Sequence, residues 1–310
     1  MRKSRRPTHA FPQGSGATQR RKRYALGLVA AVLAGGTAAG TLAAADGAAA
    51  TTARARVGAS KVVCHSDDGG LARRLSHQLA DTLRKQHSKL HSTAAVAFYD
   101  RSSGTSCTYR AGTAYDSASV VKATLLGALL RQTQEEHRKL TSREKKLATA
   151  MITKSDNEAT STLWREVGRG DVQHFLDLAG MKDTEPGRHG YWGLSQVTAG
   201  DQVKLLKLLT SGNRVLNAKS RGYELGLMNK VVAGQRWGTP SGAPKDATVH
   251  VKNGWLERDA HAWRVNSIGA FTGGGHDYGI AVLSQDSKTM CDGVDTVQAA
   301  SRAIHHQLNR

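Results

Sequence analysis

A long stretch without strand character, residues 113–247, constrains the fold of this chain more than any other feature. Strand-like segments lie on both sides of it, two before and three after. Their ranges are 93–100, 106–112, 248–252, 263–271 and 278–284. The first two are joined by a short turn containing Gly104, which predicts a hairpin. The chain must therefore bring together strands that a large helical block separates in sequence.

Helical patterns stand at both ends of this arrangement. Leucines recur at about one-turn intervals from Leu71 to Leu90, and a second amphipathic segment, 294–308, ends the chain. Because a sheet must bury its faces against other elements, the pattern predicts one five-stranded antiparallel sheet flanked by N- and C-terminal helices. We therefore expect an α+β fold, three-layered and α/β/α-like, with an all-helical subdomain inserted at about 113–247.

The N-terminus predicts export. Residues 1–45 hold eight Lys and Arg and no Asp or Glu, and residues 24–45 carry no charge. A basic start, an apolar stretch and small residues after it are typical of a signal peptide, and the stretch is also long enough for a membrane anchor. In either case the positive-inside rule places the rest outside the cytoplasm. Residues 46–60, rich in Ala, Thr, Arg and Gly, are interpreted as a linker before a single domain at 61–310.

The charge balance is strongly basic, with a formal net charge of +19. Outside the first 45 residues there remain 36 Lys and Arg against 25 Asp and Glu. Such a surface attracts anionic partners, among them nucleic acid, an acidic cell wall or a lipid surface. No basic cluster with interleaved aromatic residues and no zinc-finger spacing is present, so we expect no nucleic-acid site. A solvated basic surface is favoured over a nucleic-acid site, and contact with an anionic cell wall is the alternative that we keep.

Three cysteines, Cys64, Cys107 and Cys291, suit an oxidising compartment. They allow one disulfide and leave one thiol. None of their spacings fits a metal site, and the histidines are scattered, so no metal or cofactor is expected.

Ser119 and Lys122 form the first chemical motif. Three residues apart at the head of an apolar helical run, the two side chains share one helix face. A buried lysine has a lowered pKa and can act as a neutral base toward a hydroxyl. The alternative is a buried helix whose lysine reaches out to solvent.

Two further motifs decide between these interpretations. Ser155-Asp156-Asn157 lies in a loop between two helical segments, and Lys252-Asn253-Gly254 ends the first strand after the helical block. Each is short, but all three motifs occur in order, and each stands in a different type of element. This ordered set resembles the penicillin-recognising serine hydrolases, and most closely the class A β-lactamases. The resemblance covers roughly residues 70–308.

The resemblance implies a set of catalytic residues. Ser119 would be the nucleophile that forms an acyl-enzyme, with Lys122 as its base or as part of the proton relay. Ser155 would pass the proton to the departing nitrogen, and Lys252 would attract the substrate carboxylate and help to lower the pKa of the relay. The substrate would be a β-lactam or a peptidoglycan-type peptide, and the protein would act as a monomer.

The resemblance also implies binding residues. Asn157 would bind the side-chain amide of the substrate, and Asn253 its carboxylate. Gly254 would allow close backbone approach. The backbone N–H groups of Ser119 and Trp255 would stabilise the oxyanion of the tetrahedral intermediate.

The sequence departs from the family in two places. Asn253 stands where the family has a hydroxyl residue. Residues 181–197 lack the E-x-x-L-N motif whose glutamate activates the hydrolytic water: Glu185 comes too early, and Tyr191-Trp192-Gly193-Leu194 fills the late part. Acylation with slow deacylation is therefore expected. A D-Ala-D-Ala carboxypeptidase-like peptidase and a non-catalytic cell-wall-binding module on the same fold are the alternatives.

The cysteine pairing follows from the same architecture. In such a sheet, backed by the two terminal helices, the segment before the first helix lies near the end of the first strand. We therefore expect Cys64 to bond to Cys107, with Cys291 free at the opposite end.

Overall fold

The computed structural model describes residues 50–309. Residues 1–45, for which a signal peptide or anchor is expected, lie outside this range. None of the helices within it is long and apolar enough to cross a membrane.

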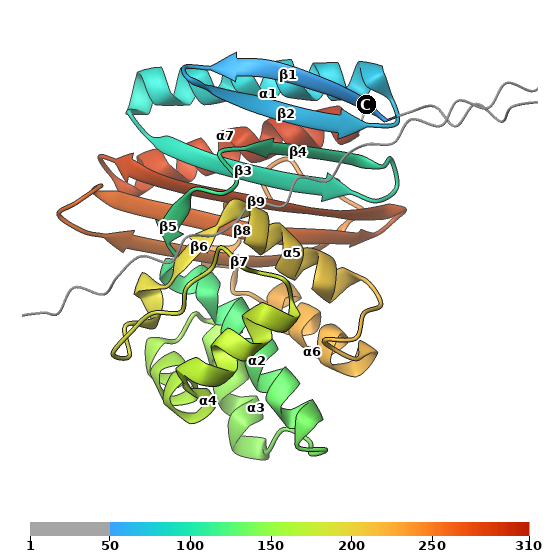
Figure 1. Cartoon of the computed structure of the whole chain (residues 1–310). Helices are drawn as coiled ribbons and strands as arrows, with labels where there is room; N and C mark the ends of the chain where they lie inside the picture. Colours follow the sequence, from blue (N-terminus) through green and yellow to red (C-terminus); the bar gives the residue numbers. More distant parts are fainter. Residues whose placement is uncertain (1–49, 310) are drawn as a thin grey trace, which may run out of the picture. The chain divides into compact units, whose positions relative to one another are not determined.

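One antiparallel sheet of seven strands runs through the described chain, in the order β1-β2-β4-β3-β9-β8-β7 (Figure 1). The five expected strands are all present, and they are consecutive in the sheet, in the order β4-β3-β9-β8-β7. The bounds are β1 (Thr51–Val57), β2 (Ser60–Ser66), β3 (Thr93–Asp100), β4 (Thr105–Tyr109), β7 (Thr248–Glu257), β8 (Trp263–Gly273) and β9 (His276–Ser287). Strands from before and after the helical block meet where β3 pairs with β9.

The two additional strands correct the expectation of a linker at 46–60 and of a five-stranded sheet. β1 and β2 pair as a hairpin at the edge of the sheet. Ala55 and Val57 of β1 are buried, whereas Arg56 between them is exposed, which is the two-residue alternation of a strand. The arginines and alanines of this segment gave it the composition of a linker and concealed that alternation.

Two helices cover one face of the sheet, α1 (Gly69–Leu90) and α7 (Met290–Leu308) (Figure 1). The side chain of Asp68 caps α1 by accepting a hydrogen bond from the N–H of Gly70 at 2.7 Å. Leu71, Leu75 and Leu79 of α1 are buried, as their spacing predicts.

The other face carries the helical subdomain. Its elements are η1 (Ala118–Val120), α2 (Val121–Glu135), α3 (Ser142–Thr153), α4 (Asn157–Leu178), η2 (Trp192–Leu194), α5 (Ala199–Thr210), α6 (Ala218–Asn229) and η3 (Ala233–Gln235). The insert is not all-helical, because β5 (Ala114–Asp116) and β6 (Gln196–Thr198) pair as a small second sheet. This pair joins the segment before Ser119 to the end of the 181–197 loop.

A disulfide joins Cys64 to Cys107, as expected, and Cys291 is free and exposed. Cys64 precedes the first helix, as expected, and it lies within the unexpected strand β2. There it stands directly opposite Cys107 of β4. The bond therefore fastens the N-terminal hairpin to the rest of the sheet.

A neutral histidine is built into the core between the sheet and α7. The Nδ1 of His305 accepts from the Tyr278 hydroxyl at 2.9 Å, and its Nε2–H donates to the carbonyl of Thr239 at 2.8 Å. The ring also meets Phe271 edge-on, with centroids 4.7 Å apart. Burial lowers the pKa of His305 to about 4.

This burial predicts loss of stability in mild acid. The folded pKa of His305 lies below the unfolded value of about 6.5, so unfolding takes up a proton between these values. The free energy of unfolding should hold above pH 6.5 and fall by about 3 kcal/mol as the pH drops to 4. Urea titrations across this range measure it. His305→Gln should flatten the profile, whereas the exposed control His77→Gln should keep it; equal slopes in both variants would contradict the assignment.

Candidate active site

Ser119 lies in the short helical turn η1, at the point where the chain enters α2. The residue before it, Ala118, has a positive φ of 47°. The chain therefore changes direction between strand β5 and Ser119. Strand β7 packs directly on this turn. A Cβ on Gly254 would lie 2.5 Å from the backbone nitrogen of Ser119, so only glycine fits there. Gly254 thus allows close approach of β7 to the Ser119 turn.

Two buried lysines meet at one hydroxyl. Lys122 of α2 donates from Nζ to the carbonyl oxygen of Ser155 at 2.6 Å and to its Oγ at 3.1 Å. Lys252 of β7 donates to the same Oγ at 3.0 Å. Both lysine side chains have no exposed surface. Three segments far apart in sequence are therefore brought together, as the three motifs predict.

Burial controls the charge of this pair. It lowers the pKa of Lys122 to about 7, against a smaller opposing effect of Asp156. Burial and the nearby Lys122 hold the pKa of Lys252 well below its ordinary value. A neutral amine is therefore accessible near neutral pH, as base catalysis by a lysine requires.

The loop between α3 and α4 supplies the middle of the site. Asp156 caps α4 by accepting from the N–H of Ala159 at 2.7 Å, and Ser155 before it has a positive φ of 57°. Asn157, the first residue of α4, accepts from Lys122 through Oδ1 at 2.8 Å. In the described chain, the hydrogen bonds of the Lys122 amine run to Ser155 and Asn157, and none reaches Ser119.

Asn253 corrects one of the expected binding roles. Its side chain is buried, and Nδ2 donates to the carbonyl oxygens of Gln235 and Trp237, both at 2.9 Å. Because neighbouring side chains of a strand point to opposite faces, Asn253 and Lys252 cannot serve the same pocket. The Asn253 amide ties β7 to the 235–237 segment instead of facing a substrate.

A cleft of about 470 Å³ opens beside Ser119. Its lining residues are Ala118, Ser119, Asn157, Gly190, Tyr191, Trp192, Gly193, Leu194, Trp255, Leu256 and Arg258. The side chain of Trp255 also packs against Trp237, with ring centroids 5.7 Å apart. Among these described lining residues there is no Asp, Glu or His, and the charged side chain is that of Arg258.

Glu185, which comes too early for the family motif, and Glu166 both form ion pairs away from the cleft. Glu185 pairs with Arg188 at 2.9 Å and with Arg169 at 3.6 Å. Glu166 pairs with Arg143 on the surface of the helical subdomain. Neither lines the cleft.

Trp192 and Arg258 are site residues that the sequence motifs did not reveal. The Lys122 Nζ lies 4.7 Å from the centroid of the Trp192 ring, an arrangement favourable to a cation. Arg258 follows β7 and belongs to the cleft lining. Both lie in segments without a motif, and only the fold brings them to the cleft. The presence of a tryptophan in the loop where the family glutamate is missing was the one available signal.

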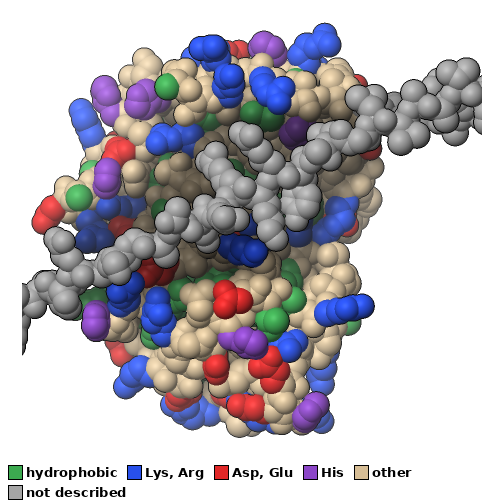
Figure 2. Space-filling model, viewed as in Figure 1, with side chains coloured by type: hydrophobic (Ala, Val, Ile, Leu, Met, Phe, Trp, Pro, Cys, Tyr) green, Lys and Arg blue, Asp and Glu red, His purple; other side chains and the backbone are tan. Residues whose placement is uncertain are grey.

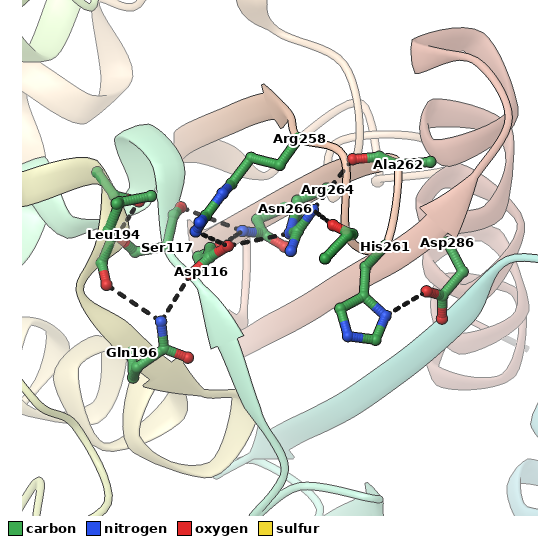
Figure 3. Close-up of polar contacts among 12 residues, drawn as sticks. Asp116, Ser117, Leu194, Gln196, Arg258, His261, Ala262, Arg264, Asn266 and Asp286 are labelled. Atoms are coloured by element: carbon green, nitrogen blue, oxygen red, sulfur yellow. Dashed lines mark hydrogen bonds and ion pairs between the residues drawn. The ribbon is translucent and has the colours of Figure 1, made fainter.

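Behind the Ser119 turn lies a buried polar network (Figure 3). Asp116 pairs through Oδ2 with Arg264 at 3.0 Å and with Arg258 at 3.1 Å, and its Oδ1 accepts from Gln196 at 2.6 Å. Asn266 donates to the carbonyl oxygens of Asp116 at 2.9 Å and of the next residue at 3.1 Å. The network joins β5, β6 and β8 and fixes the chain that leads into Ser119.

Residues 141–308 match the model of the beta-lactamase enzyme family. The chain therefore belongs to that family. The fold is that of class A β-lactamases, which are serine hydrolases. No curated protein matches the chain.

Solved structures of class A enzymes have the same fold. The TLA-3 extended-spectrum β-lactamase is 18% identical with a TM-score of 0.67, and 76% of this chain aligns with 99% of it. The β-lactamase from Sphaerobacter thermophilus is 19% identical with a TM-score of 0.66, covering 75% of this chain and 97% of that one. A class A representative from Bacteroides cellulosilyticus is 18% identical with a TM-score of 0.66, covering 76% and 99%.

The Asp116 network predicts a large loss of stability on neutralising this carboxylate. Asp116→Asn leaves Arg264, whose side chain is only 5% exposed, without its counter-charge. Removing one partner of a buried ion pair costs about 3–5 kcal/mol. Urea unfolding at pH 7 measures the loss. The matched control is the exposed Arg143–Glu166 pair, where Glu166→Gln should cost less than about 1 kcal/mol. Similar losses in both variants would contradict the structural role of Asp116.

Proposed function

We propose that this protein is an extracytoplasmic serine hydrolase that forms an acyl-enzyme on Ser119 with β-lactam or peptidoglycan-type amide substrates. The observation that carries the proposal is the Ser155 hydroxyl, held between the amines of Lys122 and Lys252 at 3.1 and 3.0 Å. A binding module would have no use for two buried lysines around one hydroxyl, because burying them is costly. A proton relay needs this arrangement.

In the proposed acylation step, the neutral amine of Lys122 takes the proton of the Ser119 hydroxyl. The Ser119 Oγ then attacks the amide carbonyl, and the backbone N–H groups of Ser119 and Trp255 stabilise the oxyanion. The C–N bond breaks as the departing nitrogen receives a proton from the Ser155 hydroxyl. Lys122 returns its proton to Ser155, so the relay ends in its starting state.

Substrate recognition is assigned to the groups that the cleft presents. Asn157 lines the cleft and would bind the side-chain amide of the substrate. Lys252 is less suited to bind the substrate carboxylate, because its pKa is held well below the ordinary value by burial and by Lys122, and because its Nζ already donates to Ser155 and to the backbone of Asn253. Arg258 pairs with Asp116 at 3.1 Å but keeps 44% of its side chain exposed, so it is better placed to pair with a substrate carboxylate.

Slow release of the acyl group is part of the proposal. The described cleft lining holds no carboxylate that could activate a water molecule. This observation favours a D-Ala-D-Ala carboxypeptidase-like peptidase as the second candidate over an efficient β-lactamase. Lys and Arg side chains spread over the visible face of the molecule, in the sheet half and in the helical half, would suit contact with an anionic cell wall (Figure 2).

The cellular location is proposed from the sequence. Residues 24–45 would serve as signal peptide or anchor, and the Cys64–Cys107 disulfide suits an oxidising compartment.

Acylation by benzylpenicillin tests the proposal. Intact mass spectrometry should find one covalent adduct, and peptide mapping should place it on Ser119. Because the base must be neutral, the acylation rate should rise with pH through about 7 and level off above it. Lys122→Met should lower the rate about 10²–10⁴-fold.

Ser119→Ala is the matched control and should take up no label. A Ser119→Ala protein that is labelled or turns over substrate as the native protein does would contradict the assignment. A folded native protein that takes up no label from benzylpenicillin or from acyl-D-Ala-D-Ala peptides would favour the non-catalytic module.

A further inference from the structure

A second cavity lies within the helical subdomain, apart from the Ser119 cleft. It has a volume of about 190 Å³ and is lined by residues from the end of α2, the turn after it, the start of α3 and the start of α6. These three helices contact one another (Figure 1). No residue lines both this cavity and the cleft. An inference about the cavity therefore stands independently of the proposed function.

Hydrogen bonds between the helices hold the cavity in shape. Gln134, at the end of α2, donates from Nε2 to the carbonyl of Val215 at 3.1 Å, and its Oε1 accepts from the N–H of Asn217 at 2.9 Å. In the turn after α2, Arg138 donates to the carboxylate of Glu144 in α3 at 2.9 Å. These contacts tie α2 to the start of α6 and to α3, so the cavity is preformed.

Part of the cavity wall is apolar. Leu130, Leu140 and the ring of Tyr223 contribute to the lining. Leu130 is buried, and the other two are partly buried and pack against the main core. An apolar cavity of about 150 Å³ is large enough to bind benzene. A cavity of about 190 Å³ with this wall therefore has room for one ring and a small substituent.

Ser220 of α6 adds a buried polar group. It lines the cavity and is only 7% exposed. Its backbone N–H donates to Asn217 Oδ1 at 2.9 Å, whereas its hydroxyl makes no hydrogen bond to any residue within 50–309. A hydroxyl this deeply buried normally has a partner. The Ser220 hydroxyl is therefore available to donate to an acceptor atom of a ligand.

The charge of the lining is positive. It includes Arg138, Lys139, Lys145 and Lys219 and no Asp or Glu. Arg138 is already paired with two glutamates of its own surroundings. The three lysines are exposed, and none of them forms an ion pair with another residue of the described chain. This uncompensated charge attracts anions, and it attracts a dianion more strongly than a monoanion.

We propose that this cavity binds a small organic anion with one ring-sized apolar group, and that it favours a dianion such as a phosphate monoester. The ring packs against Leu130, Leu140 and Tyr223. An anionic oxygen accepts from the Ser220 hydroxyl, and the lysines at the cavity compensate the charge. Because such a ligand touches α2, α3 and α6 together, it stabilises the folded helical subdomain.

An NMR titration of the full chain with phenyl phosphate tests the proposal. Amide signals around the cavity should shift and saturate, with a Kd of about 1 mM or below. Inorganic phosphate supplies the charge without the ring, and benzyl alcohol supplies the ring without the charge. Each should bind at least about tenfold more weakly, and benzoate, with one charge, should lie between them and phenyl phosphate.

Three variants separate this site from a generally basic surface. Reversing two exposed charges in Lys145→Glu/Lys219→Glu should weaken binding of phenyl phosphate about tenfold or more. Ser220→Ala should weaken it about three- to tenfold, through the lost hydrogen bond. Lys182→Glu is the matched control, since Lys182 is exposed and lies outside the cavity lining, and it should change the Kd less than about twofold.

The native protein alone can overturn the proposal. Shifts that do not saturate by about 20 mM phenyl phosphate would do so, and so would inorganic phosphate binding as tightly as phenyl phosphate, which would indicate a solvated basic surface. An equal loss of affinity in Lys182→Glu and in the double variant would also contradict a local site. An unchanged Kd in Ser220→Ala would overturn the role of that hydroxyl. None of these results bears on acylation of Ser119, so failure here and failure of the proposed function are distinguishable.

Discussion

Two lysine amines that share one buried hydroxyl are the interaction on which the rest of this structure depends. Removing an ammonium from water is expensive, and two of them around the Ser155 Oγ also repel each other. The protein meets this cost by lowering the pKa of both lysines, so that the pair carries less charge. Among the described residues, Asp156 is the anionic group that opposes this shift at Lys122, and its effect is smaller than that of burial. The two amines also donate hydrogen bonds to other groups: Lys122 to the Ser155 carbonyl and to Asn157 Oδ1, and Lys252 to the Asn253 carbonyl. This arrangement suits the proton relay of the proposed function.

The two lysines reach the Ser155 hydroxyl from different parts of the fold. Lys122 comes from α2 in the helical subdomain and Lys252 from β7 at the edge of the sheet. The close approach of β7 at Gly254 fixes one side, and the Asp116 network fixes the chain that leads into α2. The loop with Trp192 closes the third side and bonds to the same turn. Stability and chemistry are therefore coupled, because the contacts that anchor the Ser119 turn also bound the cleft.

Much of this could be read from the sequence, and the failures have physical reasons. Apolar alternation and leucine spacing predicted five strands and the two covering helices, and the three motifs predicted the meeting of Ser155 with both lysines. The β1–β2 hairpin was missed because residues 51–57 have the composition of a linker. Asn253 was assigned to the substrate although the alternation of strand side chains turns it away from Lys252. Trp192 lies in the short helical turn η2 and Arg258 directly after β7. Neither segment carries a sequence motif, and only tertiary structure determines what these side chains touch.

The central claim, a lysine base that is neutral near physiological pH, can be measured directly. Lysines labelled with ¹³C at Cε report their own titration by NMR, and Lys122→Met identifies the signal of Lys122 by its loss. The structure predicts that this signal titrates near pH 7. A Lys122 signal that titrates near 10.5, the ordinary value of a lysine, would contradict the account.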